Sequence, residues 1–211
     1  MAAVDDEDAQ HLRKLKQAHR TAATRIGRSP FPTAARGEMT VLSRLVNFQT
    51  KHMPAIRIIG KAIRMNMDMK DNPIPALWEK CFEEGSFKAL EAMEGHIVEK
   101  DYIGLICDWS NETKAYTYVC GMIMDAGCPV PEGFTSRDFP ASTVAIGWIQ
   151  GPEKDNYKDA HVLTLYELEK RGLKADDTAE WWMELYNCPR FTQPQSSGEV
   201  ILDYYIPCLE G

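Results

Sequence analysis

The fold of this 211-residue chain is decided by the stretch Met53-Pro54-Ala55-Ile56-Arg57-Ile58-Ile59-Gly60. A Pro-Ala step leads into apolar, β-branched residues, which predict a strand over residues 56–65. A similar step, Phe139-Pro140-Ala141, precedes a second apolar stretch, which predicts a strand over residues 143–150. The likeness of the two stretches indicates that the chain contains a duplicated unit.

The elements that follow each of these strands occur in the same order of helix, strand and strand. Two βαββ units of this kind pair their edge strands into one sheet. We therefore expect an α+β fold, with duplicated βαββ units in an antiparallel sheet, two helices on one face and a ligand groove on the other. The remaining predicted elements are helices over 74–83 and 160–170 and strands over 102–108, 116–124, 181–187 and 200–206.

Charge divides the chain into two parts. The formal net charge is −7, which argues against general nucleic-acid binding. Between Asp8 and Glu38, however, there are seven basic residues and no acidic one. Such an arm suits contact with nucleic acid or an acidic partner, and it equally suits a solvated, poorly ordered terminus. We expect a basic N-terminal extension over 1–47, with at most a short helix, and one domain over 48–211.

Several kinds of site and of protein are not expected. None of the six cysteines forms a C-x-x-C pair or lies at zinc-ligand spacing from a histidine, so we expect no metal and no cofactor. The N-terminus lacks an apolar secretory segment. No apolar stretch approaches the roughly 20 residues that a membrane span needs. These features predict a cytoplasmic protein without membrane contact, and they leave its oligomeric state open.

The stretch Trp181-Trp182-Met183-Glu184-Leu185-Tyr186 places one carboxylate among aromatic and apolar residues. In a strand, alternate side chains share a face, so Glu184 lies on the same face as Trp182 and Tyr186. A charge in such surroundings is costly unless something pairs with it. The partner could be a basic residue elsewhere in the chain or a cationic ligand.

The segment from about residue 48 to residue 208 resembles the GyrI-like small-molecule-binding domain, also called the AraC effector-binding domain. No single motif is strong, but the ordered set is. It comprises the stretch from Met53 to Gly60, Leu77-Trp78, Tyr118-Val119-Cys120-Gly121, Phe139-Pro140-Ala141, Gly151-Pro152, Glu184-Leu185-Tyr186 and Tyr205-Ile206-Pro207. The resemblance implies a duplicated βαββ fold, with an aromatic pocket for hydrophobic, often cationic compounds. The pocket carboxylate of this family corresponds to Glu184, in the strand that also holds Tyr186.

The resemblance leaves three functions open. The first is binding of hydrophobic or cationic small molecules, as in drug or toxin sensing or sequestration, by Glu184, Tyr186, Trp182, Trp148 and Tyr205. The second is a hydrolase that opens strained, cyclopropane-type toxins with Glu184 and Tyr186 as catalytic residues. The third is a protein-interaction role, either gyrase inhibition or the sensor subunit of a transcription regulator. Residues 1–50 are too short for a helix-turn-helix pair, so direct DNA binding is not expected.

Overall fold

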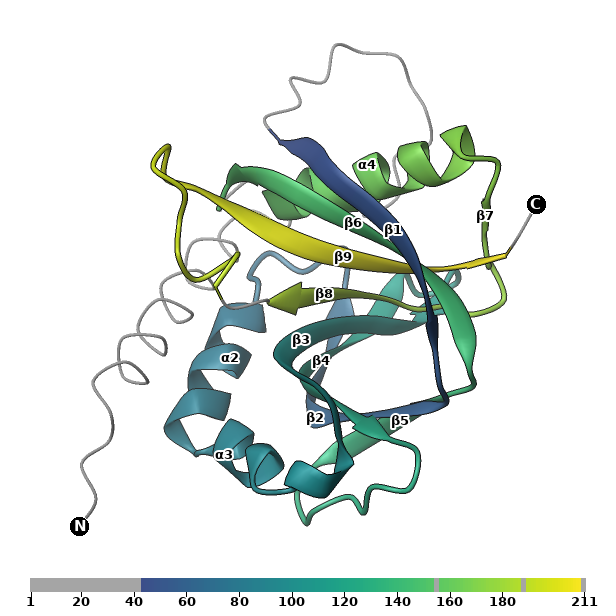
Figure 1. Cartoon of the computed structure of the whole chain (residues 1–211). Helices are drawn as coiled ribbons and strands as arrows, with labels where there is room; N and C mark the ends of the chain where they lie inside the picture. Colours follow the sequence, from purple (N-terminus) through teal and green to yellow (C-terminus); the bar gives the residue numbers. More distant parts are fainter. Residues whose placement is uncertain (1–42, 154–155, 187–188, 210–211) are drawn as a thin grey trace.

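The computed structural model describes residues 43–153, 156–186 and 189–209. The expected basic extension lies almost wholly outside these residues and stays a prediction. The described chain folds into one nine-stranded sheet, with every strand pair antiparallel, and three α-helices (Figure 1). The α+β class and the antiparallel sheet are therefore confirmed.

Except for β8, which is shorter than the strand expected over 181–187, the predicted strands are longer than expected, and two of the main strands were not predicted. The strand order across the sheet is β1-β6-β9-β8-β3-β4-β2-β5, and β7 pairs with β9. The unpredicted strands are the two at the edges of this order, β1 and β5. The bounds are β1 Arg44–Met53, β2 Ile56–Asn66, β3 Ile97–Ser110, β4 Ala115–Asp125, β5 Thr135–Phe139, β6 Ser142–Pro152, β7 Lys174–Ala175, β8 Trp182–Tyr186 and β9 Glu199–Leu209.

The duplication is visible in the pairing of the strands. One unit places β2, β4 and β3 side by side, and the other places β6, β9 and β8 in the same arrangement; β3 and β8 join the units. The short Pro-Ala links carry the chain from one unit to the other. β1 precedes Pro54 and pairs with β6, while β5 precedes Pro140 and pairs with β2. Each unit is thus completed by a strand that comes before the other unit in sequence.

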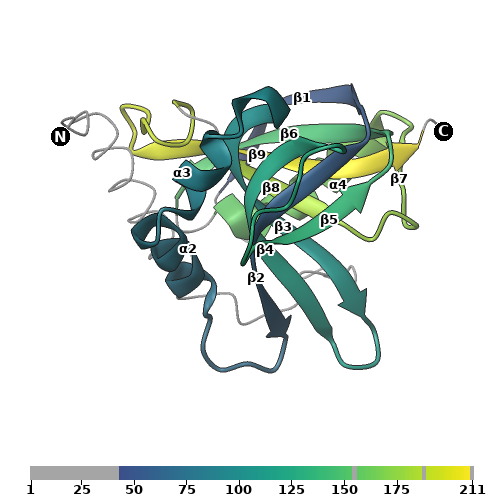
Figure 2. The ribbon, with the colours of Figure 1, turned by 90° about the horizontal axis from the view of Figure 1, so that it is seen from below.

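The helices follow the predicted pattern closely. α2 (Ile74–Glu83) matches the predicted bounds and buries Ile74, Leu77, Trp78 and Cys81, the spacing of a single helix face. The short α3 (Ser86–Glu91), which was not predicted, follows at Gly85 (Figure 2), and the 3₁₀ turn η1 (Glu94–His96) comes next. α4 runs over Asn156–Lys170, one turn longer than predicted at its start. No helix in the described residues has the length and apolar character needed to cross a membrane.

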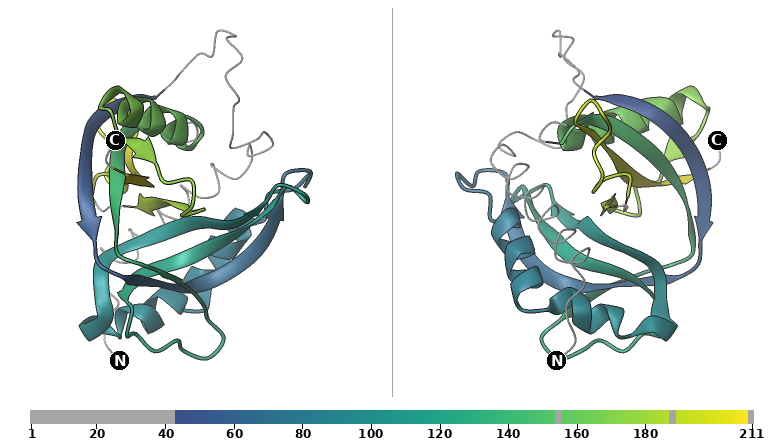
Figure 3. Two further views of the ribbon diagram at one scale, coloured as in Figure 1. Left: turned by 90° about the vertical axis from the view of Figure 1, so that its right-hand side faces the viewer. Right: turned by 60° about the vertical axis from the view of Figure 1, so that its left-hand side comes forward.

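The sheet separates two hydrophobic clusters. The first joins the buried faces of α2, α3 and α4 to the sheet face beneath them, so all three helices lie on one side. The second covers the opposite face and includes Ile58, Leu105, Val119, Ile146 and Met183. The sheet is strongly curved (Figure 3). Because both faces are buried, the central strands are apolar on both sides.

Candidate functional site

Glu184 lies in the middle of the sheet, on β8. Its backbone neighbours across the sheet are Gly104 in β3 and Tyr204 in β9. Glu184 is only 7% exposed, and its neighbours on the same face are mostly aromatic. Burial of a carboxylate among rings is costly without hydrogen bonds, so its partners determine what the site can do.

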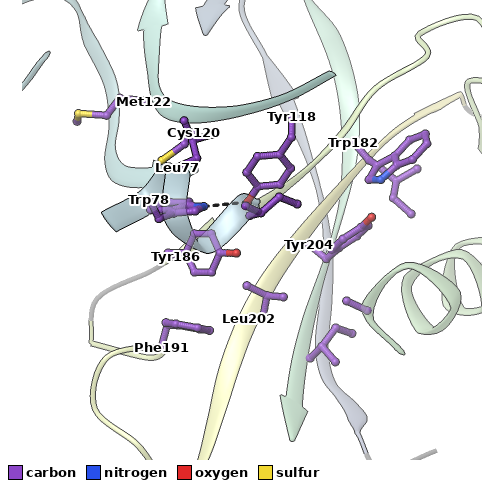
Figure 4. Packing of buried hydrophobic residues seen from close by; sticks show 14 of the residues in the cluster. Leu77, Trp78, Tyr118, Cys120, Met122, Trp182, Tyr186, Phe191, Leu202 and Tyr204 are labelled. Atoms are coloured by element: carbon purple, nitrogen blue, oxygen red, sulfur yellow. Dashed lines mark hydrogen bonds between the residues drawn. The ribbon is translucent and has the colours of Figure 1, made fainter. Parts of the chain in front are cut away.

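Two tyrosine hydroxyls satisfy one oxygen of this carboxylate. Tyr186 donates to Glu184 Oε2 at 2.9 Å, and Tyr118 in β4 approaches the same oxygen at 3.5 Å, the outer limit of a hydrogen bond. Trp78 of α2 donates through Nε1 to the Tyr118 hydroxyl at 3.1 Å. Figure 4 shows the rings of Trp78, Tyr118 and Tyr186 grouped together, with the Trp78–Tyr118 bond drawn. The network fixes Oε2 and makes no use of Oε1.

No basic side chain among the described residues forms an ion pair with Glu184. Burial raises the pKa of the Glu184 carboxyl to about 7, against the opposing effect of the two tyrosine hydrogen bonds. A buried carboxylate of this kind holds a proton or pairs with a cation from outside. Near neutral pH the protonated and the ionised forms of Glu184 are therefore close in free energy.

Gly104 makes room for this network. A Cβ atom at Gly104 would lie 2.1 Å from the Tyr118 hydroxyl oxygen and 3.1 Å from Glu184 Oε2. The missing side chain therefore allows the Tyr118 hydroxyl to lie over β3 and reach the glutamate. Gly104 does not adopt a positive φ. Glycine is therefore required here by the close approach of the Tyr118 hydroxyl and not by the backbone conformation.

Aromatic rings surround the carboxylate network on the α2 side. The Tyr186 ring packs edge-on against Trp78 at 5.0 Å and against Phe191 at 4.9 Å between centroids. These edge-to-face contacts have the geometry that aromatic pairs favour. They hold the Tyr186 hydroxyl in place beside Glu184.

Two residues of α4 approach from the other side. The Tyr157 ring lies 6.3 Å from the Tyr186 ring. His161, one turn further on, packs its ring 5.2 Å from Trp182, and its Nδ1 lies 3.2 Å from the Tyr204 hydroxyl oxygen. Burial lowers the pKa of His161 to about 4, so this imidazole is neutral at physiological pH and supplies no positive charge.

The site lies on the face that carries the helices, between α2 and α4. This differs from the expected groove on the helix-free face. The reason is the direction of alternation in β8: Trp182, Glu184 and Tyr186 point toward the helices, while Met183 and Leu185 point into the second cluster. The helix-free face at these strands is occupied by apolar side chains.

The expected site residues therefore fall into two groups. Glu184, Tyr186 and Trp182 come together, as their alternation predicts. Trp148 and Tyr205 lie on the opposite face, in or against the second cluster. There the Arg190 guanidinium lies 3.9 Å above the Trp148 ring and pairs with Asp203 at 2.8 Å. The sheet separates Trp148 and Tyr205 from Glu184.

Sequence reasoning did not assign four residues that the structure brings to the glutamate. Tyr118, Gly104, Tyr157 and Tyr204 come from β4, β3, α4 and β9. Only the alternation of Tyr116 and Tyr118 with other residues along β4 hints at a shared face. Nothing in the sequence shows which strands are neighbours of β8. Within the described parts of the chain, no group of three metal-ligating side chains occurs.

A family model described as the GyrI-like small molecule binding domain matches residues 47–208. The structure of SAV2435 bound to tetraphenylphosphonium is similar, with a TM-score of 0.55 and 11% identity over 78% of this chain and 94% of that one. A Staphylococcus aureus MU50 protein assigned to transcription regulation gives 0.53 and 13% over 78% and 99%. The EcmrR C-terminal domain gives 0.51 and 16% over 78% and 98%. At these identities the likeness shows the fold alone. No curated protein matches the chain.

Proposed function

The chain belongs to the GyrI-like small-molecule-binding family, and we propose that it binds hydrophobic cations between α2 and α4, with Glu184 as the anionic partner. The observation that carries this proposal is the buried Glu184 carboxylate, which has two tyrosine donors on one oxygen and no cation among the described residues. A ligand cation would supply the missing charge.

The chemistry of the surrounding rings supports a hydrophobic cation over a small hydrated one. A cation over an aromatic face gains about 0.5–2 kcal/mol, most when water is excluded. Tyr186 and Trp182 lie on the same face of the sheet as Glu184, and the ring of the neutral His161 packs against Trp182. No described positive group competes with the ligand for the carboxylate. The tetraphenylphosphonium bound by SAV2435 is a cation of the proposed class.

The test compares a cation with a neutral molecule of similar shape. Calorimetry would measure binding of tetraphenylphosphonium and of neutral triphenylphosphine oxide to the wild type and to Glu184→Gln. We expect the variant to lose about tenfold or more in affinity for the cation, equal to about 1.4 kcal/mol, and less than about twofold for the neutral compound. The substitution keeps the shape of the side chain, removes its charge and replaces one acceptor oxygen by an NH2 donor, while the other oxygen can still accept from the tyrosines.

Glu169→Gln is the matched control, because it removes the same charge from an exposed position of α4. Its affinities should equal those of the wild type. An equal loss for cation and neutral compound in Glu184→Gln would contradict the role of charge. The absence of any cation binding by the wild type would contradict the proposal as a whole.

A second candidate function uses the same glutamate as a base. A carboxyl with a pKa of about 7 can accept a proton from water at neutral pH. The water oxygen would then bond to a carbon of a strained three-membered ring. A bond of the ring would break, and its electron pair would pass to an electron-accepting group of the substrate. That group would then take up the proton that Glu184 accepted from water. Mass spectrometry of a cyclopropane-bearing electrophile after incubation separates the two functions, since hydrolysis adds one water and binding returns the compound unchanged.

A further inference from the structure

The start of α4 contains several buried polar atoms without a hydrogen-bond partner. Within the described residues, none is found for Glu153 Oε1, for either amide atom of Asn156, or for the Tyr157 hydroxyl. Asn156 is fully buried. Buried polar atoms in folded proteins are nearly always hydrogen-bonded, to the protein, to water or to a ligand. Their concentration in one short segment points to a partner that is not among the described residues.

Tyr157 connects this segment to the proposed cation site. Its ring lies 6.3 Å from both Tyr186 and Phe191, and Tyr186 in turn donates to Glu184. Burial raises the pKa of the Tyr157 hydroxyl, the negative charges of Glu184 and Glu153 raise it further, and the neighbouring Tyr186 hydroxyl opposes the shift. The ring therefore lies within the field of two carboxylates, Glu184 from the sheet and Glu153 from the chain just before α4.

Glu153 resembles Glu184 in having no positive partner. None of the ion pairs among the described residues includes it. Burial raises the pKa of the Glu153 carboxyl, and nothing in the described structure offsets that effect. Two desolvated carboxylates near one aromatic ring make an environment that a single positive charge would only half neutralise.

We propose that Glu153 and Tyr157 form a second polar subsite beside Glu184, and that the preferred ligand is a dication whose two positive centres are joined by an apolar body. This inference rests on the proposed function, because Glu184 holds the first positive centre. Glu153 pairs with the second, and the Tyr157 hydroxyl accepts a hydrogen bond from it where it carries an N–H. The rings of Tyr186 and Phe191 contact the apolar body between them.

The test uses matched pairs of ligands with the full chain. Bis(trimethylammonium)alkanes of increasing spacer length are compared with alkyltrimethylammonium ions of the same length. We expect the wild type to prefer the dication at one spacer length by about tenfold or more. Glu153→Gln should abolish that preference and leave the affinity for the monocation within about twofold of the wild type. Glu184→Gln should weaken both ligands.

A second variant tests the hydroxyl separately. Tyr157→Phe keeps the ring, so a diprimary alkyldiamine, which can donate hydrogen bonds, should bind several-fold more weakly, and the bis-quaternary ligand should be unaffected. Thermal unfolding of both variants confirms that they are folded. Equal weakening of monocation and dication in Glu153→Gln, or no preference for the dication at any spacer length, would overturn the inference. Neither result bears on the proposed function, which is tested separately by the effect of Glu184→Gln on the binding of monocations and neutral compounds.

Discussion

At the scale of single residues, Glu184 combines burial with two neutral donors, and this combination sets its chemistry. Tyr186 and Tyr118 donate to one oxygen and favour the charged form, while burial favours the protonated form more strongly. The result is a carboxyl that changes its charge near neutral pH. A glutamate in water would stay ionised through this range.

The raised pKa predicts the pH dependence of ligand binding. A permanent cation pairs with ionised Glu184, so below about pH 7 binding must release a proton. We expect affinity for tetraphenylphosphonium to rise by up to about tenfold per pH unit toward pH 7 and to level off above it. Titration by calorimetry in buffers of different ionisation enthalpy would measure the released proton.

The stability of the unliganded protein should fall over the pH range in which affinity for the cation rises. The pKa of Glu184 is higher in the folded chain than its ordinary value of 4.5, so the folded state binds more protons between these values. The contribution of Glu184 to stability is therefore fully present below about pH 4.5 and is lost as the pH rises to about 7. Glu184→Gln should remove this loss and the pH dependence of binding together. A pH profile of binding that persists in the variant would assign the titration to another group.

Gly104 provides a second test at this scale. In Gly104→Ala the new methyl group would overlap the Tyr118 hydroxyl, which must move away from Glu184. We expect weaker binding of tetraphenylphosphonium and a loss of about 1–3 kcal/mol in the free energy of unfolding, the usual cost of overpacking. Gly95→Ala is the control, since a Cβ there has open space and should leave both quantities unchanged. Wild-type binding by Gly104→Ala would show that the Tyr118 contact is dispensable.

At the scale of elements, one close contact joins α4 to the sheet. Thr164 of α4 lies directly over Gly147 of β6, where a Cβ atom would come within 2.3 Å of the threonine hydroxyl oxygen. Ala160 and Leu168, one turn to either side, are also fully buried. Because Tyr157 and His161 lie on the same helix, this contact sets their distance from Glu184.

Gly147→Ala should therefore push α4 away from β6. We expect a loss of about 1–3 kcal/mol in unfolding free energy, measured by chemical denaturation. We also expect weaker cation binding, because the ring of Tyr157 would shift. The double variant Gly147→Ala/Thr164→Ala restores space and should recover most of both. Failure of the double variant to recover would mean that the β6–α4 distance is set elsewhere.

At the scale of the whole molecule, the curvature of the sheet keeps the two faces distinct. Lys51 of β1 pairs with Glu99 of β3, although three strands lie between them in the sheet order. In a flat sheet these strands would be about 19 Å apart, at about 4.8 Å per strand. The sheet therefore curls toward the helix-free face and encloses the second cluster. The helix-bearing face keeps Glu184 between α2 and α4, which come from different units of the duplication.

The sequence by itself determined the α+β class, the duplicated units and most of the strands and helices. These follow from local signals: β-branched stretches, the Pro-Ala steps and the spacing of apolar residues along α2. The grouping of Trp182, Glu184 and Tyr186 also follows, since alternation in a strand is a local property. The edge strand β5 was missed because its residues, Thr135–Phe139, are mostly polar and only half-buried.

Only the tertiary structure decided which face carries the candidate site and which residues surround Glu184. Strand order joins β8 to β3 and β9, and this long-range pairing brings Gly104 and Tyr204 beside Glu184. The same pairing puts Trp148 and Tyr205 on the far side of the sheet, although both are aromatic residues of central strands. A change of register by one residue would reverse the face of every side chain in a strand. The site depends on pairings between distant segments, and no local pattern in the sequence specifies them.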